Sequence, residues 1–512
     1  MGDGGIGSRV ARNEFVPGPA HALPSTTRNR AARASSDRHA SRYIPSSVAV
    51  LVLLDYLLIG VGTTAIIGRI HRRLDFADLP RAAIAIFLSV LVSLLFLYAA
   101  GCYRRDTAIN PAAATSRLPV ALGVSAVLVF LILHYGLAFL FPSDILFISI
   151  SRCATFALIF AGISLCGAAA SRTIFNAMVR AHWFRRKVLV LGTGARALHL
   201  RTLVKEAIGP RANELCFVPE AVIGGATRAV PAELEDVVVL PAGDSPLNRL
   251  ARELEIDEIV IAPDDLESLS LDALLACKVN GIAVTDYHAF VERETGRIDL
   301  SWLELSWLVC ANGFRVRLLD AMLKRSVDIV LSLIFLIICL PVVTIAAVAV
   351  LIESGRPIFY RQERVTQGER RFVVIKLRTM RADAEKFGPE WASDNDPRIT
   401  RVGRFLRRSR IDEIPQLVNI LLGHMSFVGP RPERPVFVEQ LADQIQLYRY
   451  RHTVRAGLTG WAQVNYRYGA STEDARRKLE YDLYYIKNYS LVRDFQIMLQ
   501  TMRVLLWPVG VR

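Results

Sequence analysis

The sequence lacks the features that mark several common protein classes. Its seven cysteines include no CxxC pair and no regular spacing, which argues against a disulfide scaffold or a zinc ribbon. Charged residues make up only 21% of the 512 residues and hydrophobic residues 52%. This balance excludes disorder, a coiled coil and a collagen-like fibre, and it favours a membrane protein with room for two to four domains.

The net charge of +14 is concentrated at the two ends of the chain. Residues 1–42 contain seven arginines and three acidic residues, and residues 353–512 contain 28 Lys/Arg and 18 Asp/Glu. Because residues 1–45 also show no apolar periodicity, we predict a disordered basic tail there, and not a signal peptide. The positive charge indicates an anionic partner such as a phosphate, a nucleotide or a lipid headgroup.

Four apolar runs between residues 46 and 172 predict four transmembrane helices. Asp55 lies inside the first run, where a charge is costly unless it faces other helices, so we place it in the interior of the bundle. Basic residues before the first run and after the fourth favour cytoplasmic ends, although the first loop is basic too. The alternative is a set of buried soluble helices. The runs are 48–67, 82–100, 118–141 and 145–170.

Residues 185–315 have the pattern of a Rossmann-like domain with a parallel sheet. A short apolar strand, Lys187–Gly192, is followed by the turn Gly192-Thr-Gly194 and then by a helical pattern at 198–208. The acidic residue expected after the second strand is missing near Glu220. The domain therefore either binds a dinucleotide or keeps the fold for assembly or regulation. Further strands are predicted at 215–223, 237–240, 258–261 and 282–285.

The apolar run Ile329–Ile352 is long enough to span a bilayer. Both of its flanks are basic, so both ends favour the cytoplasmic face. Pro341 lies in its middle and removes one helix hydrogen bond, which bends a helix. We therefore predict a re-entrant membrane helix at 323–353, with a kinked spanning helix as the alternative.

Residues 354–512 contain the groups that suit chemistry on phosphates. Six arginines lie between Arg398 and Arg410, and they precede an acid pair, Asp412-Glu413, at the predicted start of a helix. Asp412 could merely cap that helix. The stiff turn Pro430-Arg431-Pro432, however, can hold an arginine for a phosphate. A basic face, an acid pair and a fixed arginine together favour phosphoryl transfer.

These C-terminal motifs resemble the bacterial sugar transferases, the monotopic polyprenyl-phosphate hexose-1-phosphate transferases that start exopolysaccharide and O-antigen assembly. The whole chain resembles the long form of that family: a four-helix bundle, a Rossmann-like domain, a re-entrant helix and a mainly helical α/β catalytic domain. The segments that carry the resemblance are 357–365, 376–380, 396–400, 412–417, 425–433, 457–465 and 481–488.

The resemblance implies a two-step reaction. Asp412 would attack the β-phosphate of a UDP-sugar and release UMP, and undecaprenyl phosphate would then take the sugar phosphate. Glu413 would assist and, with Asp412, hold Mg²⁺. For Trp461, a place in the protein core and a place lining the active site are equally expected. Substrate-binding roles are implied for Lys376, Arg378, Arg407, Pro430, Arg431 and Pro432, and Pro341 matches the proline that breaks the re-entrant helix.

The family also implies a setting and partners: the bacterial inner membrane with the catalytic domain on the cytoplasmic face, contact with membrane lipid, a homodimer, downstream glycosyltransferases and no nucleic acid. The motifs do not say which sugar is transferred. Two rival functions stay open. One is a non-catalytic scaffold of a polysaccharide assembly complex, and the other is a sugar-modifying enzyme that uses a nucleotide in the Rossmann-like domain.

Overall fold

A computed structural model of the chain describes residues 46–506 apart from several segments. The predicted basic tail at 1–45 lies outside the described residues, as do Glu220 and most of the loops that were used to predict orientation. The internal segments that are not described are 71–78, 105–106, 108–110, 138–149, 182, 185, 209–212, 220–233, 235–236, 239–245, 266–268, 304, 382, 385–395, 467–468 and 470.

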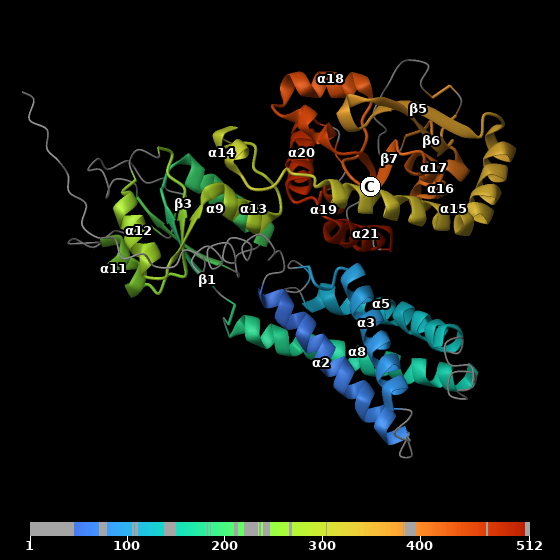
Figure 1. Cartoon of the computed structure of the whole chain (residues 1–512), viewed down its shortest axis with the longest axis horizontal. Helices are drawn as coiled ribbons and strands as arrows, with labels where there is room; N and C mark the ends of the chain where they lie inside the picture. Colours follow the sequence, from blue (N-terminus) through green and yellow to red (C-terminus); the bar gives the residue numbers. More distant parts are fainter. Residues whose placement is uncertain are drawn as a thin grey trace, which may run out of the picture. The chain divides into compact units, whose positions relative to one another are not determined.

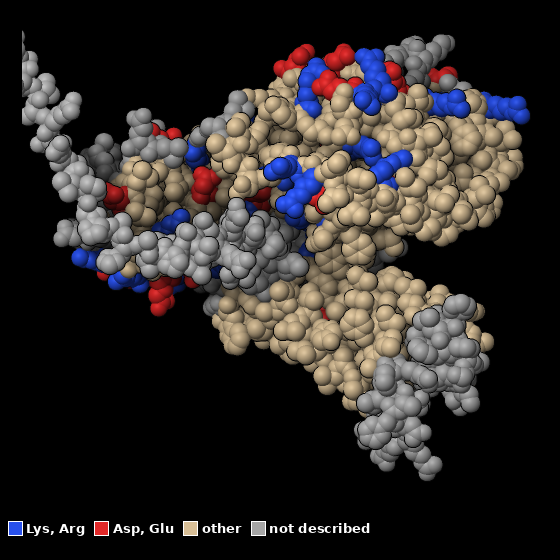
Figure 2. Space-filling model, in the orientation of Figure 1, with Lys and Arg blue, Asp and Glu red and all other residues tan. Residues whose placement is uncertain are grey.

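The four N-terminal apolar runs form helices that pack against one another (Figure 1). Leu51, Ile59, Leu97 and Phe160 are fully or almost fully buried between them, whereas the face of the bundle that is seen in Figure 2 bears hardly any charge on its described residues. The helices are α2 (Ser46–Ile70), α3 (Leu79–Ala99), α5 (Pro111–Leu131), which continues as a π-helical turn, η1 (Ile132–Leu137), and α8 (Ile150–Arg180).

Asp55 lies inside this bundle, as predicted, with no exposed surface. Both of its carboxylate oxygens accept hydrogen bonds from Nη1 of Arg172 at 2.7 Å, and one also accepts from the Tyr103 hydroxyl at 2.7 Å. Helix α8 continues past Arg172 to Arg180, ten residues beyond the predicted end of its apolar run.

Four helices of the described chain are long and apolar enough to cross a membrane. Three belong to the bundle and the fourth is α15 (Leu318–Ser354), while the apolar part of α3 is shorter, at Ala83–Ala99. The spans are Val48–Ala65, Thr115–Tyr135, Cys153–Arg180 and Leu318–Ser354.

A parallel sheet follows the bundle, in the strand order β2-β1-β3-β4. Alternate residues of β1 face opposite sides: Val188 and Val190 pack on α9 and α13, and Leu189 and Leu191 pack on α11 and α12. We call residues 186–303 the sheet domain. Its elements are β1 (Arg186–Leu191), α9 (Ala195–Ile208), β2 (Asn213–Val218), α11 (Pro246–Glu253), β3 (Glu258–Ile261), α12 (Leu271–Val279), β4 (Ala283–Asp286) and α13 (Tyr287–Thr295).

The C-terminal domain is mainly helical and carries two small sheets, an antiparallel β5–β6 hairpin and a parallel β7–β8 pair. Its elements, after the short helix α14 (Leu305–Cys310) and the long α15, are β5 (Phe359–Val365), η3 (Gln367–Glu369), β6 (Arg371–Leu377), α16 (Arg401–Ser409), η4 (Ile411–Glu413), α17 (Gln416–Leu421), β7 (Met425–Val428), α18 (Pro435–Gln444), η5 (Tyr448–Thr453), β8 (Ala456–Thr459), α19 (Trp461–Asn465), α20 (Thr472–Lys487) and α21 (Leu491–Leu506).

Helix α15 touches the C-terminal domain at both of its ends. Near its start, Lys324 Nζ donates to the carbonyl of Val428 at 2.9 Å, and at its end the carbonyl of Ser354 accepts from Arg378 at 2.5 Å. Within α15 no residue between Ser332 and Ala346 is buried. A straight helix of this length would separate its ends by about 55 Å, and Figure 1 shows the ribbon of α15 changing direction before β5.

The sheet domain is joined to α19 and α20 by buried polar contacts. Trp461 donates from Nε1 to the carbonyl of Gly296 at 2.8 Å, and its ring stacks on Tyr484. The backbone N–H of Ile298 donates to the carbonyl of Glu480 at 3.1 Å. Trp461, which is only 4% exposed, therefore belongs to the packed junction of the two domains.

Candidate active site

The acid pair lies in η4, a single turn between α16 and α17, and α17 begins only at Gln416, after the position predicted for the helix start. The absence of a side chain at Gly403 lets α16 lie close to the chain that follows β6, because a Cβ at this position would be 2.1 Å from the carbonyl oxygen of Thr379. The capping residue of α17 is Pro415, without a side-chain hydrogen bond. Asp412 therefore does not cap α17, and its carboxylate is available for another role.

Glu413 is held by three cationic side chains. Its Oε1 accepts from Lys376 Nζ at 3.1 Å and from Arg431 Nη2 at 3.0 Å, and Arg410 Nη1 lies 3.6 Å away. These charges keep the pKa of Glu413 well below its usual range although the residue is buried. Burial in turn lowers the pKa of Lys376, against the attraction of Glu413.

Asp412, the residue before Glu413, is in the opposite electrostatic situation. It is 7% exposed, and its Oδ1 has no hydrogen-bond partner in the described part of the chain. Burial, and then the charge of Glu413, raise its pKa to about 6, while Lys376, Arg410 and Arg407 oppose the rise. Glu413 is thus held in its charged form by its partners, whereas Asp412 titrates about one unit below neutral pH and is still mostly ionised at pH 7. Such a divergence between two neighbouring carboxyl groups is typical of functional sites.

The predicted phosphate-binding residues do not all meet at the pair. Lys376 and Arg431 contact Glu413 directly, and half-buried Arg407 acts on Asp412 through its charge. Arg378 instead donates to the carbonyls of Ser354 and Gly355 at 2.5 and 2.7 Å, so it secures the end of α15.

The Pro430-Arg431-Pro432 turn is anchored through its carbonyl oxygens. The carbonyl of Pro430 accepts from the N–H of Gly457 at 2.9 Å, and the carbonyl of Pro432 accepts from Arg364 Nη1 at 3.2 Å. Proline restricts the backbone and offers no N–H, so the turn is held by its neighbours while the Arg431 side chain reaches Glu413.

The sequence pattern indicated Arg410 only as the last of six closely spaced arginines. In the structure Arg401, Arg404 and Arg408 are exposed, whereas Arg410 adopts a left-handed conformation at φ 59° that ends α16 and brings its side chain near Glu413. The separation of three residues between Arg410 and Glu413 is the signal that could have identified this contact.

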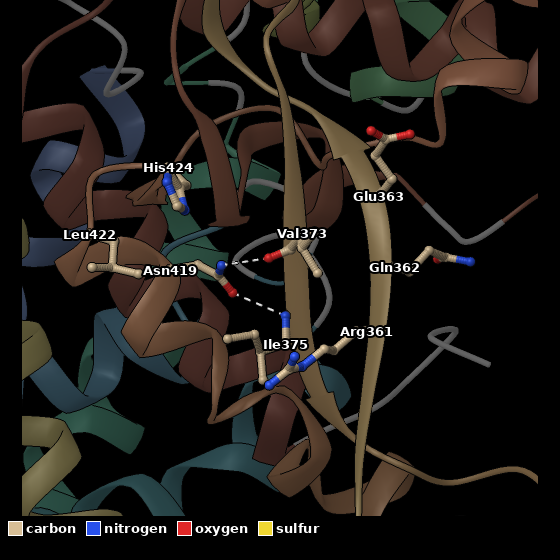
Figure 3. A pocket seen from close by; sticks show the side chains of 8 residues that line it. All are labelled: Arg361, Gln362, Glu363, Val373, Ile375, Asn419, Leu422 and His424. Carbon is tan, nitrogen blue, oxygen red and sulfur yellow. Dashed lines mark hydrogen bonds between the residues drawn. The ribbon is translucent and has the colours of Figure 1, made fainter. Parts of the chain in front are cut away.

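A cavity of about 530 Å³ lies between the β5–β6 hairpin and α17 with the residues that follow it, and the acid pair is not among its lining residues (Figure 3). Ile375 and Val373 face this cavity from β6, whereas Lys376, the next residue, points to the opposite face of the hairpin. Asn419 links α17 to β6, because its side-chain amide forms hydrogen bonds with the backbone of Val373 and Ile375 (Figure 3). The cavity is lined by Arg361, Gln362, Glu363, Val373, Ile375, Asn419, Leu422 and His424.

The acid pair fits a Mg²⁺ ion that keeps most of its waters. Such an ion is commonly bound by one or two carboxylates together with substrate phosphates. Asp412 Oδ1 is a buried carboxylate oxygen to which no described residue donates a hydrogen bond. Oε1 of Glu413 is already engaged by Lys376 and Arg431, so Asp412 is the better placed ligand. Among the described residues no group of three or more His, Cys, Asp or Glu side chains could hold a metal.

The glycine turn of the sheet domain is closed by one of the domain's own carboxylates. Asp264, which follows β3, accepts hydrogen bonds from the N–H groups of Ala195 and Arg196 at 3.1 and 3.0 Å. These are the helix N-terminal donors that would otherwise face a pyrophosphate. A Cβ on Gly194 would lie 2.2 Å from Asp264 Oδ2, so this glycine is required by an internal contact.

Comparisons with known proteins identify the C-terminal domain. A family model described as "Bacterial sugar transferase" matches residues 319–508. The exopolysaccharide production protein PSS of Rhizobium leguminosarum bv. phaseoli is 38% identical over 192 residues, which cover 36% of this chain and 94% of that protein.

Two further relatives match this chain over only part of their own length. The UDP-N-acetylgalactosamine-undecaprenyl-phosphate N-acetylgalactosaminephosphotransferase of Aeromonas hydrophila is 39% identical over 249 residues, 49% of this chain and 58% of that protein. The UDP-glucose:undecaprenyl-phosphate glucose-1-phosphate transferase of Escherichia coli K12 is 40% identical over 184 residues, 36% of this chain and 40% of that protein. The chain thus spans about half the length of these two relatives. With the acid pair, the Arg431 turn and the match over 319–508 together, this chain belongs to the bacterial sugar transferase family.

Proposed function

We propose that this protein transfers a hexose-1-phosphate from a UDP-sugar to undecaprenyl phosphate and so starts the assembly of an exopolysaccharide repeat unit. The observation that carries the proposal is the buried Oδ1 of Asp412, which has no hydrogen-bond partner among the described residues, beside a Glu413 that is held by Lys376 and Arg431. A scaffold would gain nothing from a buried carboxylate without a partner, because such a group lowers stability.

The proposed reaction consists of two successive displacements at the β-phosphorus. A carboxylate oxygen of Asp412 bonds to the β-phosphorus of the UDP-sugar, and the bond from that phosphorus to the bridging oxygen breaks, so UMP leaves with the electron pair. An oxygen of undecaprenyl phosphate then attacks the same phosphorus, and the Asp412 carboxylate is released. Arg431, Lys376 and Arg407 supply positive charge for the phosphates, and Mg²⁺ at the acid pair, when bound, would neutralise diphosphate charge.

We place this reaction at the cytoplasmic face of the bacterial inner membrane. The contacts of both ends of α15 with one domain, and Pro341 in its unburied middle, support a re-entrant helix. Such a helix would hold the acid pair near the headgroups, where the acceptor phosphate lies. We keep a homodimer and downstream glycosyltransferases as proposed partners.

The test is a labelled-phosphate assay with the full-length protein in membranes, Mg²⁺ and a panel of UDP-sugars. Without acceptor, we expect a burst of UMP close to one equivalent of enzyme and a phosphorylated protein. With undecaprenyl phosphate, we expect turnover and a labelled lipid, and the active donor identifies the sugar. A folded protein that releases no UMP from any donor would favour the scaffold.

The raised pKa of Asp412 predicts an acid limit for the first step. Only the ionised carboxylate attacks, so the rate of the UMP burst should be half-maximal near pH 6, where the pKa of Asp412 lies, and should fall about tenfold per pH unit below it. The charge of Glu413 raises that pKa, so Glu413→Gln should move the limit to lower pH. A burst rate independent of pH between 5 and 8, or a shift to higher pH in the variant, would contradict this assignment.

The alternative, a nucleotide-dependent enzyme built on a Rossmann-like domain, is disfavoured by Asp264. Sensitivity to substitution at Gly192 or Gly194 does not test it, because Gly192 has φ +121° and Gly194 packs on Asp264. We expect Gly194→Ala to lower the thermal midpoint and Asp264→Ala to relieve that loss. NAD⁺ should not raise the midpoint of the wild-type protein, whereas stabilisation by NAD⁺ would support the alternative.

A further inference from the structure

Four consecutive carbonyl groups of the turn at residues 430–433 accept hydrogen bonds from three different elements, β8, β5 and η5. The Pro430 carbonyl is bound by β8 and the Pro432 carbonyl by β5, and the Glu433 carbonyl accepts from the N–H of Val365 at 3.0 Å. The carbonyl of Arg431 itself accepts from Nη2 of Arg451 at 3.0 Å. Of the four carbonyls, this one belongs to the residue whose side chain contacts Glu413.

Arg451 is well suited to fix that carbonyl. It is 5% exposed, and its Nη2 also donates to Asp482 Oδ2 at 2.9 Å, while Nη1 donates to the Tyr448 hydroxyl at 2.6 Å. Asp482 is itself 2% exposed on helix α20. A planar guanidinium that binds three acceptors cannot rotate without breaking one of these hydrogen bonds. It therefore holds the Arg431 carbonyl at a fixed position relative to Asp482 and Tyr448.

We propose that Arg451, held by Asp482, is a positioning residue for the transfer reaction: it fixes the main chain of Arg431 so that the Arg431 guanidinium meets Glu413. This rests on the proposed function. Without the contact, the two prolines would still stiffen the turn but would not set its distance from η4. A displacement of about 1 Å at a charged site can cost about 100-fold in rate.

The test is a double-mutant cycle measured by the single-turnover UMP burst of the full-length protein. Arg451→Lys keeps the charge but loses the fork, and we expect about a 100-fold slower burst. In an Arg431→Met background the same change should slow the burst by no more than about 3-fold, because its effect passes through Arg431. Arg449→Met is the matched control, since Arg449 lies on the same η5 turn and pairs with exposed Glu369; its burst should stay within about 2-fold of wild type.

The burst rate and the burst amplitude together separate positioning from a merely structural role. Arg451→Lys should lower the burst rate at saturating UDP-sugar and change the KM for the donor in the same direction as Arg431→Met does, and the double variant should change neither further. A merely structural loss would lower the burst amplitude, which counts active protein, and leave the rate unchanged. If Arg451→Lys does not fold, as judged by its thermal midpoint, Asp482→Asn carries the same cycle with a smaller loss.

Each outcome has a distinct meaning. A folded Arg451→Lys protein with a burst within about 3-fold of wild type, or a loss that multiplies in full on Arg431→Met, overturns the positioning role. Absence of a burst in the wild-type protein would instead overturn the proposed function.

Discussion

Replacing Asp412 by asparagine is expected to abolish the UMP burst and to reduce sugar-phosphate transfer by about 10⁴-fold or more, because positioning and charge alone remain once a nucleophile is lost. Asparagine has nearly the same shape, but its amide cannot form an acyl phosphate. The measurement is the labelled-phosphate assay with the donor identified for the wild-type protein.

The same variant should be no less stable than the wild-type protein. The pKa of Asp412 is raised in the folded state, so this carboxyl favours folding below its unfolded pKa and that contribution is lost as the pH rises through about 6. Asparagine stays neutral at pH 7. Asp443→Asn, on the exposed face of α18, is the control and should leave both rate and thermal midpoint unchanged. A labelled lipid product that persists in Asp412→Asn would remove Asp412 as the nucleophile.

Of the substitutions proposed, Lys324→Met is expected to cause the largest loss of folding stability. Lys324 Nζ donates to Asp494 Oδ2 at 2.5 Å, to the carbonyl of Val428 and to the Tyr485 hydroxyl, all of them buried. Removing one member of a buried ion pair leaves the other charge uncompensated and costs about 3–5 kcal/mol. Thermal unfolding of the detergent-solubilised protein should show a midpoint lower by roughly 6–20 °C.

Two further variants check the cause. Ser326→Ala changes an exposed neighbour on α15 and should leave the midpoint within a degree or two of wild type. Adding Asp494→Asn to Lys324→Met removes the stranded charge and should recover much of the loss. If the double variant is no more stable than the single one, the ion pair is not what holds α15 to β7 and α21.

The elements that depend on local pattern were predictable from the chain alone. The apolar runs became helices, and the strand predicted at 258–261 is β3, because run length and alternation report burial directly. The acid pair and its neighbouring arginines were also visible, since they are close in sequence. The short turn η4 was not, because three residues have no period and their conformation depends on the packing of α16.

The sequence by itself therefore determined the membrane helices, the parallel sheet and which residues are candidates for chemistry. Only the tertiary structure decided which charges meet. Lys376 reaches Glu413 across 37 residues, and Lys324 reaches Asp494 across 170. Arg378, two residues from Lys376, binds the end of α15, and Asp264 closes the glycine turn by accepting from Arg196, 68 residues before it along the chain. Such pairings depend on how distant elements pack, and spacing along the chain does not encode that distance.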